Sequence, residues 1–162
     1  MSIDTGAPPL HFLLLGHAKE HVRAVIEHYS IQNAVIFTSM ELEGENLPFI
    51  RSLQDEGVVI AEMINLEPFG QDALERMTAR ILDTYHIHSR SGRTEFVVAL
   101  TGGTNLMVVA MALVALMKGL PAHYVLNNGR NEVVEIDLFE RLAPYVDAEE
   151  VEAQIRAGGG ER

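Results

Sequence analysis

At 162 residues, the chain is long enough for one domain with a full hydrophobic core and too short for two ordinary domains. Its composition, with 48% hydrophobic and 22% charged residues, is typical of globular proteins and excludes a disordered or fibrous chain. The formal net charge of -11 argues against binding to duplex DNA or RNA, which requires a basic surface. A compact local site could still hold a small anion.

The chain has no cysteine, which excludes disulfides, thiolate metal sites and a cysteine nucleophile. We expect no metal and no cofactor. Residues 1–9 lack the basic and apolar segments of a signal peptide, so they are predicted to be a flexible N-terminus of a cytoplasmic protein. Residues 96–117 are uncharged and long enough to span a membrane, but the Thr-Gly-Gly-Thr-Asn interruption favours a strand followed by a helix.

Short apolar runs alternate with segments of helical periodicity along most of the chain. In chain order, the patterns predict strands over 11–15, 34–37, 58–64, 96–100 and 122–126, separated by helices over 19–29, 47–54, 71–88 and 106–117. Strands and helices that alternate in this way form parallel sheets covered by helices. The sequence therefore predicts an α/β protein with a Rossmann-like three-layer α/β/α fold.

The C-terminal part adds the last strand of this sheet through a β-hairpin in place of a helix. The run Asn127-Asn128-Gly129-Arg130 is typical of a β-hairpin and predicts an antiparallel edge strand over 133–136, the sixth strand of a mainly parallel sheet. We place the domain at residues 10–145. Residues 146–162 are predicted to form a short helix near 148–155 and a disordered tail from Gly158 onward.

The turn between the fourth strand and the fourth helix is the most informative segment. Gly102 and Gly103 allow positive φ and a close approach to a ligand, while the free N–H groups of the following helix attract negative charge. Thr101 and Thr104 add hydroxyl groups and can cap the helix. This pattern predicts an anion-binding turn.

In a sheet of this type, ligands bind at the carboxyl ends of the strands near the point where the strand order reverses. The loops expected at that edge are 16–19, 38–45, 65–70, 101–105 and 127–130, and several contain small polar donors. From them we select candidate ligand-binding residues: Gly16, His17, Ser39, Met40, Thr101, Gly102, Gly103, Thr104, Asn105 and Asn127.

The run Thr101-Gly102-Gly103-Thr104-Asn105-Leu106-Met107 resembles the signature of the CRISPR-associated Rossmann-fold (CARF) family, and the Thr38-Ser39 strand end is similar to that family as well. The resemblance implies a homodimeric receptor for cyclic oligoadenylate, most commonly cyclic tetra-adenylate, the second messenger of type III CRISPR defence. Some members also cleave this ring. The absence of a following effector domain in this sequence makes the cleaving activity attractive.

Two functional hypotheses follow from the resemblance. In the first, the protein is a metal-independent ring nuclease in which a ribose 2′-hydroxyl attacks its own phosphate, with His17, Lys19 and Asn105 as catalytic candidates. In the second, it is a sensor or sponge without chemistry, acting through a partner effector protein. A generic nucleotide-binding flavodoxin-like module is a weaker third hypothesis. Asn105 stands where several members have lysine, so it offers neutral donors in place of a charge.

The helix predicted over 106–117 has no polar face. A helix that is hydrophobic all round must be covered on more than one side, and the sheet covers only one. We therefore predict a homodimer in which Ala110, Met111 and Val114 pack at the interface.

Overall fold

The computed structural model describes residues 6–159. Their strands are β1 (Leu10–Leu15), β2 (Asn33–Ser39), β3 (Val59–Leu66), β4 (Phe96–Ala99), β5 (Ala122–Leu126) and β6 (Glu132–Ile136). The helices are α1 (Glu20–Tyr29), α2 (Glu43–Asp55), α3 (Ala73–Arg90), α4 (Asn105–Lys118), α5 (Leu138–Leu142) and α6 (Ala148–Gly159), with a 3-10 helix, η1 (Met40–Leu42), before α2.

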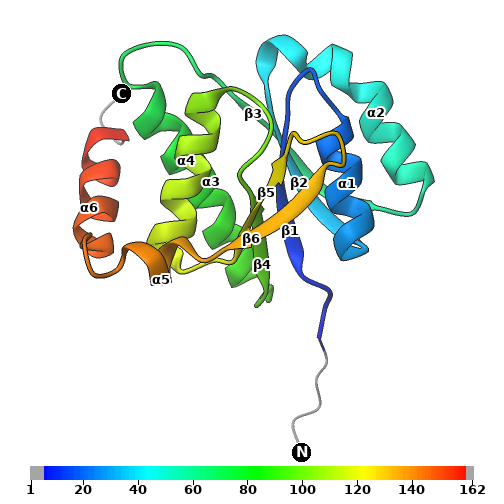
Figure 1. Cartoon of the computed structure of the whole chain (residues 1–162). Helices are drawn as coiled ribbons and strands as arrows, with labels where there is room; N and C mark the ends of the chain where they lie inside the picture. Colours follow the sequence, from blue (N-terminus) through cyan, green and yellow to red (C-terminus); the bar gives the residue numbers. More distant parts are fainter. Residues whose placement is uncertain (1–5, 160–162) are drawn as a thin grey trace, which may run out of the picture.

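The strands form one sheet in the order β3-β2-β1-β4-β5-β6 (Figure 1). Strands β1 to β5 are parallel, and β6 pairs antiparallel with β5, as the Asn-Gly sequence predicts. The chain moves from β1 outward to β3, then returns to β4 beside β1 and continues outward to β6. The strand order therefore reverses between β1 and β4, and the predicted Rossmann-like fold is confirmed.

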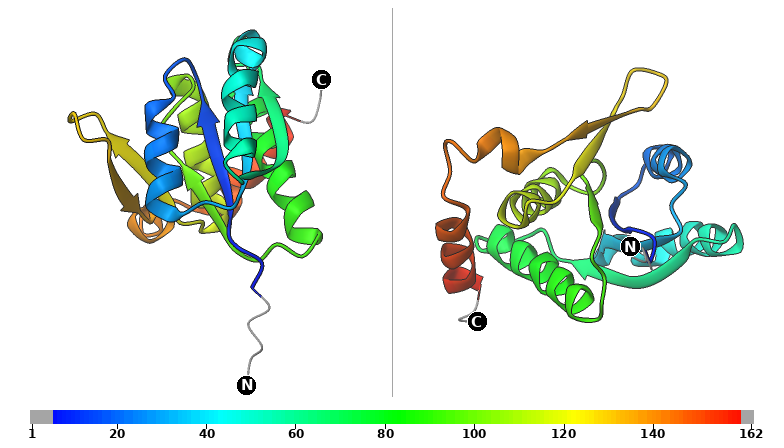
Figure 2. Two further views of the ribbon diagram at one scale, coloured as in Figure 1. Left: turned by 90° about the vertical axis from the view of Figure 1, so that its right-hand side faces the viewer. Right: turned by 90° about the horizontal axis from the view of Figure 1, so that it is seen from below.

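Helices cover both faces of the sheet, as Figure 2 shows, with α1 and α2 on one face and α3 and α4 on the other. All six residues of β1 are buried because this central strand is covered on both sides. The β5–β6 hairpin extends past the helices at one edge. This arrangement leaves the carboxyl edge of β1 and β4 open.

Helix α4 is covered within a single protomer more completely than its sequence predicts. Ala110, Met111 and Val114 are fully buried in the core cluster under α4, so the prediction that they form a dimer interface is wrong. The physical reason is that α3, α5 and α6 pack around α4 in addition to the sheet. The part of α4 that stays open includes Leu106, which is half-buried, and Val109, which is 45% exposed.

Helix α6 includes the helix predicted near 148–155, and it packs against the rest of the chain. Helix α6 packs on α3 and α4, and Lys118 donates a hydrogen bond to Glu152 across that contact at 2.9 Å. Gly158, predicted to begin a disordered tail, is the penultimate residue of α6; residues 160–162 of the predicted tail lie outside the described residues. Helix α5 was not predicted, although Asp137 accepts a hydrogen bond from the Glu140 N–H and caps it.

The predicted flexible N-terminus falls partly outside the described residues, which begin at residue 6. Within them, the Pro8 carbonyl accepts a hydrogen bond from Arg93 at 3.1 Å, and Arg93 also donates to Asn33. This contact ties the segment before β1 to the loop before β4, at the amino edge of the sheet.

Candidate functional site

The turn from β4 to α4 has the backbone geometry that its glycines predict. Gly102 has φ +114° and Gly103 has φ +64°, both in the left-handed region. A Cβ atom on Gly102 would clash with the carbonyl oxygen of Leu14 and lie 2.6 Å from Nε2 of His21. The turn is therefore packed directly onto the end of β1, and Gly102 lacks a side chain for steric reasons as well as conformational ones.

Thr104 caps α4, as predicted. Its Oγ1 accepts a hydrogen bond from the Met107 N–H at 3.2 Å, and its backbone is extended. The N–H groups of Asn105 and Leu106 lie in the first turn, where no intrahelical acceptor exists. Together with the positive end of the helix dipole, these free N–H groups make the environment at the start of α4 favourable for negative charge.

Thr101 has a structural bond that the sequence did not reveal. Its Oγ1 accepts a hydrogen bond from the Val125 N–H at 2.8 Å, which ties the start of the turn to β5. The hydroxyl proton of Thr101 is still available as a donor, because Oγ1 is the acceptor in this bond.

A small hollow of about 130 Å³ lies on the β2 side of the turn. It brings together predicted residues from three separate loops, and a fourth loop adds Pro68 and Phe69. Its lining consists of Gly16, His17, Ser39, Glu41, Leu42, Pro68, Phe69, Gly103 and Thr104. The loop after β1 and the glycine turn approach each other closely here, because a Cβ on Gly16 would lie 3.0 Å from the Gly103 nitrogen.

A second hollow of about 320 Å³ lies on the β5 side of the same turn, next to the hairpin. It contains two predicted residues, Thr101 and Asn127, and its full lining is Ala18, Glu20, His21, Thr101, Val125, Asn127 and Asn131. The Gly102-Gly103 turn thus lies between two hollows at the point where the strand order reverses.

Three of the candidate ligand-binding residues line neither hollow: Met40, Asn105 and Gly102, which lies in the turn between the two hollows. Met40 is 62% exposed and lines a depression near Asn65 and Arg76, on the β3 side. Asn105 is exposed at the first turn of α4, adjacent to Thr104.

The two basic side chains of the first loop, His17 and Lys19, lie close to the carboxylate of Glu45. His17 Nδ1 lies 3.3 Å from both oxygens of Glu45. Lys19 donates to the His17 carbonyl at 2.9 Å, and its Nζ lies 3.9 Å from Glu45. An anion at this edge must therefore bind mainly through backbone N–H groups and hydroxyls, since Glu45 offsets much of the local positive charge.

The chain was compared with known proteins by sequence and by structure. No family model and no curated protein match the sequence. In structure, the chain is similar to Csm6 from Enterococcus italicus, solved with cyclic hexa-2′-fluoro-hexa-dAMP, at a TM-score of 0.69 and 12% identity over 95% of this chain and 49% of Csm6. This chain spans about half the length of Csm6.

Two further structures have the same fold over about three quarters of this chain. One is a type III CRISPR defence DNA nuclease activated by cyclic oligoadenylate, at a TM-score of 0.58 and 22% identity, covering 74% of this chain and 19% of the nuclease. The other is Can2 from Sulfobacillus thermosulfidooxidans in complex with cyclic tetra-adenylate. Its TM-score is 0.57 at 15% identity, and the match covers 77% of this chain and 36% of Can2. The chain has the CARF fold.

The CARF fold of this chain places a further histidine, His21, at the carboxyl edge of the sheet, which is not among the residues predicted from the sequence. His21 Nε2 lies 3.3 Å from the Leu14 carbonyl oxygen, and His21 also lines the second hollow. Because a carbonyl only accepts, Nε2 carries the proton and Nδ1 has a free lone pair. Burial lowers the pKa of His21 and favours this neutral form. Its position in the first turn of α1, directly after the 16–19 loop, is the signal that could have indicated it.

Metal-binding clusters and membrane-spanning helices were also sought among the described residues. Among residues 6–159, no group of three or more histidine and carboxylate side chains is placed to hold a metal ion. Within the same range, no helix is long and apolar enough to cross a membrane.

Proposed function

We propose that this protein binds a cyclic oligoadenylate of type III CRISPR defence, most favourably cyclic tetra-adenylate, at the carboxyl edge of its sheet and between two protomers in the cytoplasm. The observation that carries the proposal is the Gly102-Gly103 turn, which lies between two hollows at the reversal of strand order. Csm6 and Can2, which have the same fold, were solved with cyclic adenylate ligands, and this supports the proposal.

The phosphates would be held by neutral hydrogen-bond donors, so their binding does not require a positively charged protein. In this proposal, the N–H groups of Asn105 and Leu106 point at one phosphate from the positive end of α4. The hydroxyls of Ser39 and Thr104 line the adjacent hollow and supply further donors. Oriented donors of this kind can bind an anion in a protein of net charge -11, because the field that matters is local.

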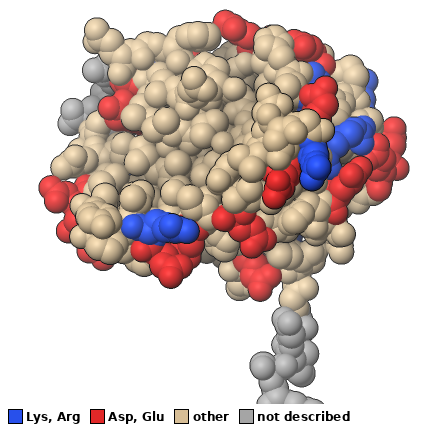
Figure 3. Space-filling view, viewed as in Figure 1, with Lys and Arg blue, Asp and Glu red and all other residues tan. Residues whose placement is uncertain are grey.

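The exposed side of α4 and the neighbouring hairpin support a homodimer. In Figure 3, the face over α4, β5 and β6 shows no charged side chain in its central part. Val109 on α4 and Leu126 at the end of β5 are among the exposed apolar residues, while Leu106 and Leu113 are half-buried beside Val109. A twofold axis near this face would bring two copies of the turn together, which suits a symmetric ring.

Replacing Val109 with glutamate should convert the dimer to a monomer, because a charge would be buried at the twofold axis. Light scattering after size-exclusion chromatography measures the mass directly. Ile87→Glu is the matched control, since Ile87 is exposed on α3 and should tolerate the same change. A monomeric wild-type protein, or a Val109→Glu variant that stays dimeric, would contradict the proposed interface.

Asn105 allows a direct test of the charge at the helix terminus. Asn105→Lys should tighten cyclic tetra-adenylate binding roughly fivefold and Asn105→Asp should weaken it by a similar factor, since each adds one charge beside a phosphate. Isothermal titration calorimetry measures both affinities. Gln154→Lys, on the exposed surface of α6, makes the same change in net charge far from the edge and should have little effect. Equal effects at both positions would exclude a local phosphate contact at Asn105.

Ring cleavage is a second candidate function, favoured by the His17–Glu45 pair at the mouth of the smaller hollow. In this reaction, His17 would take the proton of a ribose 2′-hydroxyl. The 2′-oxygen would bond to the adjacent phosphorus and the 5′-oxygen would leave, taking up a proton, to give a 2′,3′-cyclic phosphate. Lys19 would fix the loop through the His17 carbonyl, and Asn105 would donate to a phosphate oxygen.

Incubation with cyclic tetra-adenylate, followed by chromatography and mass spectrometry, separates cleavage from mere binding. If the protein cleaves the ring, His17→Ala should slow the reaction roughly a hundredfold while ring binding is retained. His28→Ala, at an exposed histidine on the last turn of α1, should leave the rate unchanged. Intact ring after long incubation with wild-type protein would instead select the sensor function, with a partner effector protein receiving the signal.

A further inference from the structure

His21 is a half-buried titratable side chain at the carboxyl edge of the sheet that the proposed function does not use. It lies in the first turn of α1, and its Nε2 lies 3.3 Å from the Leu14 carbonyl oxygen. The imidazole also contacts the glycine turn, because a Cβ added to Gly102 would lie 2.6 Å from the same nitrogen. His21 is therefore packed against both the end of β1 and the turn that precedes α4.

The two nitrogens of the His21 imidazole have different surroundings. Nε2 carries the proton that is donated to Leu14. Nδ1 has no hydrogen-bond partner among the described residues and is not one of the polar atoms that are buried without a partner, so solvent reaches it. The side chain lines the second hollow, next to Thr101. A second proton can therefore bind at Nδ1 without breaking the hydrogen bond at Nε2.

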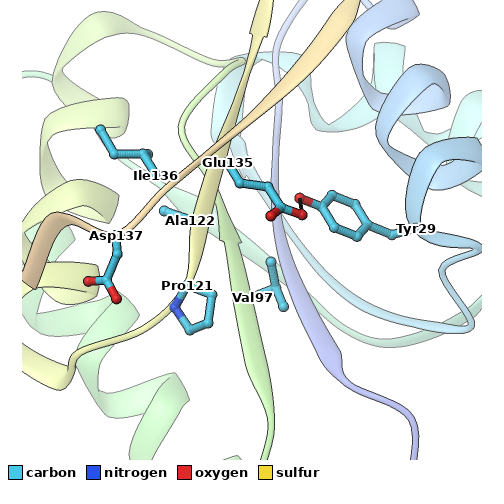
Figure 4. A pocket seen from close by; sticks show the side chains of 7 residues that line it. All are labelled: Tyr29, Val97, Pro121, Ala122, Glu135, Ile136 and Asp137. Atoms are coloured by element: carbon cyan, nitrogen blue, oxygen red, sulfur yellow. Dashed lines mark hydrogen bonds between the residues drawn. The ribbon is translucent and has the colours of Figure 1, made fainter. Parts of the chain in front are cut away.

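Helix α1 holds this imidazole in a fixed position. The hydroxyl of Tyr29, the last residue of the helix, donates a hydrogen bond to Glu135 on β6 at 3.0 Å (Figure 4). Near the other end, Arg23 donates to both carboxylate oxygens of Glu56 at 3.0 Å. These bonds tie α1 to β6 and to the end of α2, so protonation of His21 changes the charge of its side chain while the helix stays in place.

Glu20 and His123 are the other titratable side chains in the walls around His21. Glu20 lines the same hollow, and its carboxylate accepts a hydrogen bond from the Lys19 N–H at 3.1 Å. His123 on β5 lines a narrow void between α1 and the sheet, which His21 also lines. Burial lowers the pKa of His123 to about 4, so it is neutral at pH 7. The remaining side chains that line the hollow and the void are uncharged.

The free protein favours the neutral form of His21. Burial lowers the pKa of His21, and the hydrogen bond to Leu14 and the charge of Glu20 only partly oppose this effect. The basic side chains of the preceding loop lie close to the carboxylate of Glu45. A phosphate bound at the start of α4 would add negative charge near the imidazole and favour its protonated form. Phosphate binding and protonation of His21 are therefore coupled.

We propose that His21 is neutral in the free protein and takes up a proton from solvent at Nδ1 when a phosphate of cyclic oligoadenylate binds beside the Gly102-Gly103 turn. This inference rests on the proposed binding of cyclic oligoadenylate at this edge. The proton uptake supplies a positive charge in a site whose other donors are neutral or already lie beside a carboxylate. Because the complex holds more protons than the free protein, binding tightens as the pH falls.

Calorimetric titration with cyclic tetra-adenylate at pH 6.5, in MES and in bis-Tris, measures the proton uptake, because the two buffers have different ionisation enthalpies. We expect about half a proton per chain, and binding roughly fivefold tighter at pH 6 than at pH 7.5. His21→Gln keeps an N–H donor for Leu14 but cannot be protonated, so it should lose most of the uptake and of the pH dependence. His17→Gln, which removes the other histidine of this edge, and His28→Gln, at an exposed position on the same helix, should both retain the uptake.

Long-range ¹H–¹⁵N spectra of the histidine side chains show the charge of His21 directly, in the wild-type protein. We expect the neutral form protonated at Nε2 without ligand and the imidazolium form in the complex, with His21→Gln identifying the signals. Binding without proton uptake, a neutral His21 in the complex, or uptake that disappears in His17→Gln and persists in His21→Gln would overturn this inference and leave the proposed function intact. Failure of cyclic tetra-adenylate to bind would overturn the proposed function as well.

Discussion

Replacing Gly102 with alanine is expected to lower the free energy of unfolding by about 3 kcal/mol or more, which is a large part of the stability of a domain of this size. The added Cβ would clash with the Leu14 carbonyl oxygen and with His21 Nε2, and both belong to packed elements that cannot move independently. The positive φ of +114° adds backbone strain. Urea denaturation monitored by circular dichroism measures the change.

Gly57 provides a matched control for the Gly102 variant. It has φ +97°, close to that of Gly102, but a Cβ at Gly57 would meet no atom within 4 Å. Gly57→Ala should therefore cost only the backbone strain, about 1 kcal/mol. Equal losses in the two variants would show that the turn is not packed on β1 as described, and would remove the steric basis of the site.

Acidification is expected to unfold the protein through its buried histidines. Burial lowers the pKa values of His11 and His123 to about 4, against 6.5 for an unburied histidine. Between these values the unfolded chain binds more protons than the folded one, so stability falls as the pH falls. The full stabilisation is present above pH 6.5, and the loss at pH 5 is about 2 kcal/mol for each histidine.

Urea titrations at pH 7.5, 6 and 5 measure how steeply the free energy of unfolding falls with pH, and one variant shows how much of this fall is due to His123. His123→Phe keeps an aromatic ring next to Tyr29 and removes two unpartnered nitrogens, so it should reduce the acid-induced loss by about half. His28→Gln, at an exposed position, should keep the wild-type slope. A wild-type protein as stable at pH 5 as at pH 7.5, or an unchanged slope in His123→Phe, would contradict this assignment.

The order of the elements and the glycine turn before α4 could be predicted from the sequence because both depend on local patterns. Alternating apolar runs and amphipathic segments define the strands and helices, and the Asn128-Gly129 pair defines the hairpin. The cap at Thr104 follows from its position before an apolar helix, and the structure confirms it. The parallel topology also predicts that the loops after β1, β2 and β4 meet at one edge of the sheet. Their residues Gly16, His17, Ser39 and Gly103 indeed line one hollow.

The contacts that depend on packing between distant segments could not be predicted. The sequence of α4 shows that the helix is apolar all round, but not that α6 covers it, so Ala110, Met111 and Val114 were assigned to an interface when they belong to the core. The hydrogen bond from Val125 to Thr101 and the pairing of His17 with Glu45 connect residues far apart in the chain. No local pattern encodes such contacts.

Titration of the ¹⁵N-labelled protein with cyclic tetra-adenylate, with amide chemical shifts as the readout, tests the central claim most directly, since it reports affinity, stoichiometry and place together. We predict saturable shifts at the amides of residues 102–106, with smaller shifts around Ser39 and Asn127, at one ring per two chains. Linear tetra-adenylate serves as the control and should bind more weakly. Failure to bind cyclic tri-, tetra- and hexa-adenylate, or binding that leaves the amides of residues 102–106 unshifted, would contradict the account.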